Sequence, residues 1–168
     1  KGEMENLKNR YVSLEESLLS FSKLSGETKD KKVISIRANI ELTSELKVAK
    51  KYGAEGIGMY RTEFLFTRKE QFPSVEEQYL DYLNLFEDNL FNETTIRTLD
   101  TGGDKSGNLN HQENNPALGL RGIRYSLANK EIFISQINAI LKVAQDKKKT
   151  IRILLPMIST IDEIIESI

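Results

Sequence analysis

The sequence of 168 residues contains no cysteine, and this absence removes several kinds of chemistry. Without thiols the chain forms no disulfide, no thiolate metal site and no cysteine nucleophile. It also has no apolar run near the roughly 20 residues that a membrane span needs, and no signal-peptide pattern at its start. We therefore expect a cytoplasmic protein with no membrane partner.

A strong excess of one charge is also absent. The 24 basic and 25 acidic side chains give a formal net charge of −1. Nucleic-acid binding calls for a strongly basic face, so nucleic acid is not an expected partner. Two lysine-rich stretches, at 29–32 and 147–149, directly precede predicted strands, and we interpret them as solvated surface at the amino ends of those strands.

Residues 1–32 are expected to form a linker helix and a loop. Apolar side chains recur there at alternating spacings of three and four, which is typical of a helix whose apolar stripe packs on another surface. This apolar stripe comprises Met4, Leu7, Tyr11, Leu14, Leu18 and Phe21. The pattern stops after Leu24, where Gly26 and mixed charge mark the loop.

Residues 33–168 alternate short β-rich runs with longer helical stripes. The pattern predicts strands at 33–40, 53–60, 94–100 and 151–158, and helices at 43–52, after Pro73, at 130–145 and after Thr160. Four βα units in a row favour an α/β domain with a parallel sheet covered by helices. Function is then expected at the carboxyl ends of the strands.

Three arginines stand at or just after the ends of predicted strands: Arg61, Arg97 and Arg121. Guanidinium groups are rarely left in a core without a counterion, and their planar forks suit phosphate and carboxylate. We therefore expect a site for a small polyanion. For Arg61 a structural ion pair with Glu63 is an alternative.

The third predicted strand gives the most specific pattern, because Arg97 is followed by Asp100, two glycines, Asp104 and Lys105. Successive glycines let backbone N–H groups turn toward a phosphate, and a lysine adds a point charge, although a pair of glycines also makes an ordinary turn. In the first strand, Arg37 and Asn39 form either a polar pair facing a ligand or an edge pair without one.

The runs MYRTEFLF (59–66), TIRTLDTGGDK (95–105) and NNPALGLRGIR (114–124) resemble the enzyme I family of the bacterial phosphoenolpyruvate:sugar phosphotransferase system, the phosphoenolpyruvate-protein phosphotransferases. The resemblance extends from about Val33 to the C-terminus. It implies a truncated barrel domain at 33–168, the first half of a (β/α)8 barrel with about four βα units, preceded by a linker helix.

The resemblance also implies an activity. Family members bind phosphoenolpyruvate and Mg²⁺ and pass the phosphoryl group to a histidine on a separate domain, and from there to a phosphocarrier protein that drives sugar uptake. By this resemblance Arg61 and Arg97 grip the substrate phosphate, Arg121 is a third active-site arginine, and Asp100 and Lys105 line the same pocket. Asn39 is added as a substrate-binding candidate from its position in the first strand.

Several family groups have no counterpart in this chain. The Mg²⁺-binding carboxylates, another phosphate-binding arginine and a proton-donating cysteine belong to later strands, and the phosphohistidine belongs to an N-terminal domain. His111 matches no catalytic histidine, so we interpret it as a surface residue. The chain begins with Lys1 and ends within a helical pattern, so we expect an inactive piece of a longer, homodimeric enzyme.

Two other functions remain open from the sequence. A pyruvate phosphate dikinase or phosphoenolpyruvate synthase shares the YRTE-like and GLRG-like runs, and a nucleotide-grasp domain upstream would reveal it. A nitrogen-regulatory relative of enzyme I would carry a sensory domain upstream.

Overall fold

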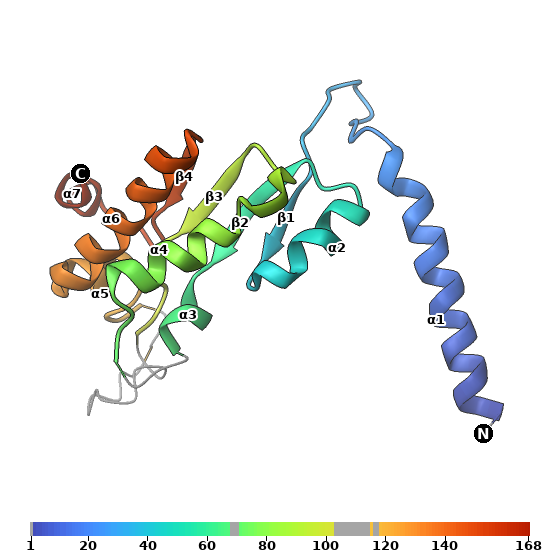
Figure 1. Cartoon of the computed structure of the whole chain (residues 1–168), viewed down its shortest axis with the longest axis horizontal. Helices are drawn as coiled ribbons and strands as arrows, with labels where there is room; N and C mark the ends of the chain where they lie inside the picture. The colour runs from blue at the N-terminus through green and yellow to red at the C-terminus, as the bar shows by residue number, and fades with distance from the viewer. Residues whose placement is uncertain (1, 68–70, 103–114, 116–117) are drawn as a thin grey trace.

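The computed structural model of the chain describes residues 2–67, 71–102, 115 and 118–168. Strands and helices alternate in it as the sequence pattern predicts (Figure 1). In chain order the elements are α1 (Gly2–Ser20), η1 (Phe21–Lys23), β1 (Arg37–Ile40), η2 (Thr43–Glu45), α2 (Leu46–Lys51), β2 (Gly56–Arg61), α3 (Glu63–Thr67), α4 (Val75–Asn84), η3 (Glu87–Asn89), β3 (Thr94–Arg97), α5 (Ile123–Ala128), α6 (Lys130–Lys147), β4 (Ile151–Leu154) and α7 (Ile161–Ser167).

The four strands form one parallel sheet in the order β1-β2-β3-β4. This confirms the α/β class and the parallel sheet. Arg61 of β2 pairs with Arg97 of β3, and Arg97 pairs in turn with Leu154 of β4. Because parallel strands end at the same edge of a sheet, the two arginines lie side by side at the carboxyl edge.

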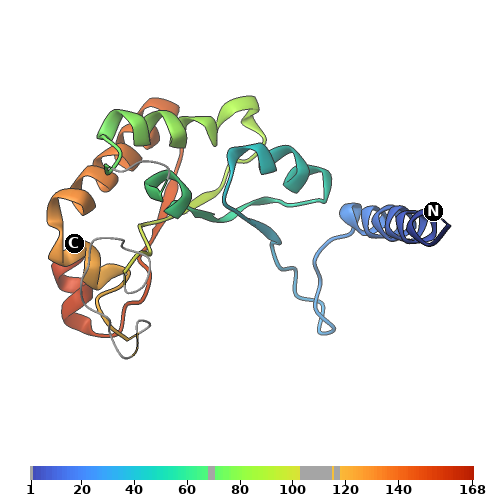
Figure 2. The ribbon, with the colours of Figure 1, turned by 90° about the horizontal axis from the view of Figure 1, so that it is seen from below.

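Helices α2, α4 and α6 cover one face of the sheet, as both views show (Figures 1 and 2). Residues from the strands and from these helices form the main core between the two layers: Ile57, Tyr60, Ile96, Leu46, Leu85, Ala139, Ile140 and Val143. A fully buried Leu or Ile side chain contributes about 1.5–3 kcal/mol to stability. Since Tyr60 and Ile96 point into this core, their neighbours Arg61 and Arg97 point to the opposite face.

The predicted linker helix is present as α1, but its apolar stripe is not buried. Exposed fractions along the stripe run from 77% at Met4 to 50% at Leu18. The helix touches the sheet domain through Glu15, which accepts hydrogen bonds from the hydroxyl of Tyr52 at 2.8 Å and from Lys51 Nζ at 3.4 Å. In both views α1 stands apart from the sheet (Figures 1 and 2). The packing expected for the stripe is therefore not made within the described part of the chain.

Element boundaries differ from the predicted ones in a regular way. Helices α4 and α7 each begin at a capping box, in which the side chains of Ser74 and Thr160 accept hydrogen bonds from the backbone N–H groups of Glu77 and Glu163. The strands are shorter than predicted; β4 ends at Leu154, because Pro156 lacks a backbone donor. Two short helices, α3 and α5, fall where only connecting segments were expected. None of the helices in the described ranges is both long and apolar enough to cross a membrane.

Candidate functional site

Two of the three predicted arginines bind the same carboxylate just beyond the end of β3. Arg121 donates from Nε to Asp100 Oδ1 at 3.0 Å and from Nη2 to Asp100 Oδ2 at 3.4 Å. Arg97 Nη1 lies 3.3 Å from Asp100 Oδ2. Asp100 is only 7% exposed, so its charge is largely removed from water and depends on the two guanidinium groups.

Glu63 fixes Arg97 from the other side. Its Oε1 accepts from Arg97 Nη2 at 2.8 Å and from the backbone N–H of Asp100 at 3.1 Å. One carboxylate oxygen therefore connects the first residue of α3 to both ends of the Arg97–Asp100 segment. The alternative that Glu63 is the partner of Arg61 is wrong.

Arg61 instead binds Glu41, which directly follows β1. Arg61 Nη2 donates to Glu41 Oε2 at 2.7 Å, and both side chains are partly exposed. Because Arg61 and Arg97 pair across neighbouring strands, their like charges would repel each other without such counterions. Glu41 was not singled out from the sequence. Its position directly after the first predicted strand was a signal that could have identified it.

Gly102 brings the segment after β3 against the backbone of Arg121. The two residues form an isolated antiparallel bridge, and Gly102 has φ +139°. A Cβ at this position would lie 2.1 Å from the carbonyl oxygen of Leu120. Because Gly102 has no side chain, its backbone can approach the backbone of Arg121 closely. This contact places Arg121 near Asp100.

The remaining predicted residues divide into three groups. Asn39 is exposed on β1, where it pairs in register with Met59 of β2. Arg37 lies at the opposite, amino end of β1 and forms an ion pair with Glu93, which also binds Arg152 of β4 at 2.6 Å. The Arg37–Asn39 pair is thus not one unit facing a ligand. Lys105, Asp104 and His111 lie outside the described residues.

Two buried polar residues next to the arginines were also missed from the sequence: Thr62 and Gln136. Thr62 directly follows Arg61, and Gln136 lies on the covered face of α6 among Phe133, Ile140 and Val143. A polar residue at a position of an apolar helical stripe is the sequence signal that could have identified Gln136.

The arrangement offers guanidinium groups held in place by carboxylates. Arg61, Arg97 and Arg121 meet the described carboxylates Glu41, Glu63 and Asp100 at one edge of the sheet. Within the described residues, the Nε atoms of Arg61 and Arg97 are buried and have no hydrogen-bond partner. A guanidinium has five donors, and the Arg61 side chain is 42% exposed, so this arginine is suited to take an added phosphate or carboxylate oxygen.

No metal site accompanies these arginines in the described ranges. No group of three or more histidine, cysteine, aspartate or glutamate side chains there is placed to hold an ion. The carboxylates Glu63 and Asp100 are already engaged by arginines. The described donor set therefore does not fit Mg²⁺, which prefers oxygen ligands in octahedral geometry.

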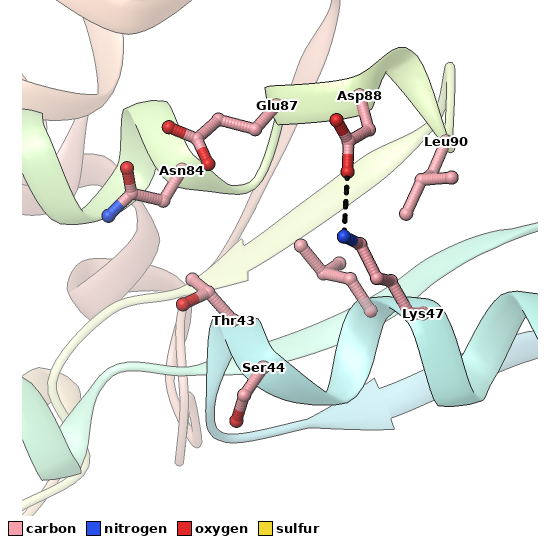
Figure 3. A pocket seen from close by; sticks show the side chains of 8 residues that line it. Thr43, Ser44, Lys47, Asn84, Glu87, Asp88 and Leu90 are labelled. Carbon is pink, nitrogen blue, oxygen red and sulfur yellow. Dashed lines mark ion pairs between the residues drawn. The ribbon is translucent and has the colours of Figure 1, made fainter.

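A pocket of about 480 Å³ lies elsewhere, between the start of α2 and the end of α4 (Figure 3). In it Lys47 points toward Asp88, with Nζ 3.3 Å from Oδ2, and the walls carry the hydroxyls of Thr43 and Ser44. The pocket is built by segments outside the strands, and none of the predicted site residues lines it. It is therefore separate from the arginine cluster.

Comparison with known protein families gives one match that covers most of the chain. Residues 15–168 match the model of the PEP-utilising enzyme, PEP-binding domain. The match includes all three arginines and their described carboxylate partners.

Three of the relatives compared with this chain are named phosphoenolpyruvate-protein phosphotransferase. The chain is 42% identical over 159 residues to the phosphoenolpyruvate-protein phosphotransferase of Buchnera aphidicola subsp. Baizongia pistaciae, covering 94% of this chain and 27% of that protein. The same-named protein of Mycoplasma capricolum is 41% identical over 158 residues, covering 92% of this chain and 27% of that protein. For the Staphylococcus aureus protein the identity is 37% over 162 residues, covering 95% and 28%. The chain thus spans little more than a quarter of the length of these relatives.

Proposed function

The chain belongs to the PEP-utilising enzymes, with a match to their PEP-binding domain over residues 15–168, and from this we propose that its arginine cluster binds the phosphate of phosphoenolpyruvate. The observation that carries this proposal is the convergence of Arg97 and Arg121 on Asp100, beside Arg61 at the same edge of the sheet. Carboxyl ends of parallel strands are the usual place for a ligand in α/β folds.

In this proposal the arginines contact the substrate and the carboxylates hold the arginines. A buried carboxylate repels a phosphate, so Asp100 acts through Arg97 and Arg121, to which it is bound. Lys105 and Asn39 are proposed as further substrate-binding residues, Lys105 from the family resemblance and Asn39 from its exposed position on β1.

The proposed reaction is phosphoryl transfer from phosphoenolpyruvate to a histidine, and from there to a phosphocarrier protein, driving sugar uptake. Negative charge spreads over the transferred group and the departing enolate in the transition state. Arg61, Arg97 and Arg121, held by their carboxylates, stabilise that charge without having to reorient during the reaction. The histidine and the proton donor for the enolate are proposed to lie in the remainder of a protein of the relatives' length.

Mg²⁺ is the proposed cofactor of such a complete protein, where it would neutralise phosphate charge when bound. Among the described residues, the carboxylates of Glu63 and Asp100 are already paired with arginines, and the Mg²⁺ ligands are proposed to lie outside this chain.

The proposed setting follows the family resemblance. Residues 1–32 would be a linker helix and loop, and residues 33–168 would form the first half of a (β/α)8 barrel. The complete protein would be a cytoplasmic homodimer. The relatives reported above are named phosphoenolpyruvate-protein phosphotransferases. Their names do not favour the dikinase or the nitrogen-regulatory alternative over the proposed function.

The proposal is tested with two substitutions in a protein of the relatives' length that carries this chain. Arg97→Ala is expected to lower kcat/KM for pyruvate release about a hundredfold, the usual cost of removing one electrostatic donor. Lys148→Ala, an exposed position at the amino edge of β4, is the control and should change it less than about twofold. Comparable losses from both substitutions would exclude the arginine cluster as the substrate site.

The 168-residue chain by itself is expected to be inactive and to bind phosphoenolpyruvate weakly, because it supplies only part of the site. Calorimetric titration with phosphoenolpyruvate and Mg²⁺ measures this directly. Micromolar affinity would show that the essential groups all lie within the chain.

A further inference from the structure

Gln136 is a buried amide on the helix layer that reaches the carboxyl edge of the sheet. It lies on α6 and is 1% exposed, between the buried apolar side chains of Phe133 and Ile140. An uncompensated amide in such a place would cost about 1–3 kcal/mol, so its hydrogen-bond partners matter.

Two of the three hydrogen bonds of this amide go to Thr62 and Leu99, which adjoin the arginine cluster in the chain, and the third goes to Tyr82 of α4. Gln136 Oε1 accepts from the backbone N–H of Leu99 at 2.9 Å. Gln136 Nε2 donates to Thr62 Oγ1 at 3.1 Å and to the Tyr82 hydroxyl at 3.1 Å. Burial raises the pKa of Tyr82 well above its ordinary value, so the hydroxyl stays protonated, and it donates to Gln78 Oε1 at 3.3 Å.

Thr62 extends the hydrogen-bond network to Arg97 at the end of β3. Its hydroxyl donates to the backbone carbonyl of Arg97 at 2.9 Å, and the residue is completely buried. Thr62 follows Arg61 in the chain, and Leu99 precedes Asp100. Through these contacts one amide on α6 connects the residues adjoining Arg61 and Asp100 with the backbone of Arg97.

We propose that Gln136, acting through Thr62 and Leu99, is a positioning residue that sets the spacing of Arg61, Arg97 and Asp100. This inference rests on the proposed function, because the spacing of these residues matters only if they bind phosphoenolpyruvate. Buried and fully satisfied polar networks fix one arrangement of the groups they join. A misplacement of about 1 Å at a binding group costs up to about a hundredfold in activity.

A role in stability alone is the competing explanation, and matched variants separate the two. Gln136→Met keeps the size of the side chain and removes its polar atoms. Thr62→Val removes the relay hydroxyl, whereas Thr62→Ser keeps it. Val143→Ala is the control, because Val143 is fully buried on the same helix and belongs to the apolar core.

The measurements are the Kd for phosphoenolpyruvate and the melting temperature, in a protein of the relatives' length that carries this chain. We expect Gln136→Met and Thr62→Val to raise the Kd about tenfold, and Thr62→Ser and Val143→Ala to stay within about twofold of wild type. Val143→Ala is nevertheless expected to lower the melting temperature. Equal losses in Val143→Ala and Gln136→Met, or an unchanged Kd in Gln136→Met and Thr62→Val, would overturn the inference. If Gln136→Met does not fold, the Thr62 pair decides.

Hydrogen exchange of the Leu99 and Asp100 amides provides a readout without ligand. Faster exchange at these two amides in Gln136→Met, but not in Val143→Ala, supports the positioning role. Unchanged exchange overturns it. If the wild-type protein does not bind phosphoenolpyruvate, the proposed function fails, and the exchange data then decide separately whether Gln136 orders the strand ends.

Discussion

Arg121 and Asp100 form a side-on ion pair, with two donor atoms of one guanidinium on the two oxygens of one carboxylate. The pair joins residues 21 positions apart, and Asp100 also binds Arg97. It is therefore the point at which the end of β3 and the segment before α5 are held together.

Asp100→Asn is predicted to lower the free energy of unfolding by about 3 kcal/mol, because it leaves two partly buried guanidinium groups without their shared charge. Urea denaturation of wild type and variant measures the difference. Glu76→Gln, which removes an exposed pair with Lys142, is the control and should change stability by less than about 1 kcal/mol. An Asp100 variant as stable as this control would mean that the ion pairs contribute nothing to the fold.

Gly58→Ala is predicted to lower the free energy of unfolding by about 1–3 kcal/mol through steric overlap. Arg37 of β1 lies against Gly58 of β2, and a Cβ on Gly58 would come within 2.9 Å of the Cβ of Arg37. Since both atoms are next to the backbone, a strand has to shift. Gly2→Ala is the control, because nothing lies within 4 Å of the added atom. Equal thermal stability of the two variants would contradict the contact.

The stabilising effect of Glu93 is predicted to be lost in acid. The hydrogen bond and charge of Arg152, together with the charge of Arg37, lower the pKa of Glu93 from its ordinary value of 4.5. A group whose pKa is lowered by folding stabilises the fold above its ordinary pKa, and this contribution disappears as the pH falls through the folded value. Glu93→Gln should therefore be less stable than wild type at pH 7 and equally stable well below pH 4.5. A difference that persists unchanged in acid would argue against the charge as its cause.

Leu14→Gln in α1 is predicted to leave the melting temperature of the 168-residue chain unchanged, because Leu14 is 56% exposed. Ile140→Ala is the contrast, since Ile140 is fully buried and its truncation should cost about 2–5 kcal/mol. Thermal unfolding followed by circular dichroism compares them. A clear loss of stability in Leu14→Gln would show that another surface covers the stripe in solution.

The sequence predicts the elements whose signals are local. The capping boxes at Ser74 and Thr160 depend on residues three positions apart, and both helices begin where predicted. Strand ends are less predictable, because a strand continues only while a neighbour supplies backbone hydrogen bonds. Apolar residues after Leu154 therefore lengthened the predicted strand beyond β4. The short helix α5 begins after Gly122, which has a positive φ. A helix this short has too few apolar positions for a helical period to show in the sequence, so it was not predicted.

The residues of the candidate site also differ in whether local sequence could predict their positions. Arg61 directly after a predicted strand is a local signal, and the structure places it at the end of β2. Arg97 was expected within a strand at 94–100, whereas β3 ends at Arg97. Their partners depend on contacts across the fold. Glu41 lies 20 residues from Arg61, and Gln136 lies 74 residues from Thr62. A single sequence has no local pattern that joins such residues, so the support of the site emerges only when the strands and helices are assembled.

The pairing of Arg61, Arg97 and Arg121 with Glu41, Glu63 and Asp100 also has a kinetic consequence. Among these six side chains, the formal charges of three arginines and three carboxylates cancel. A distant anion therefore meets almost no net attraction from these six groups, and their guanidinium donors act only at contact distance. Their contribution to the association rate constant should change little with ionic strength, whereas three unpaired arginines would give electrostatic steering that added salt abolishes.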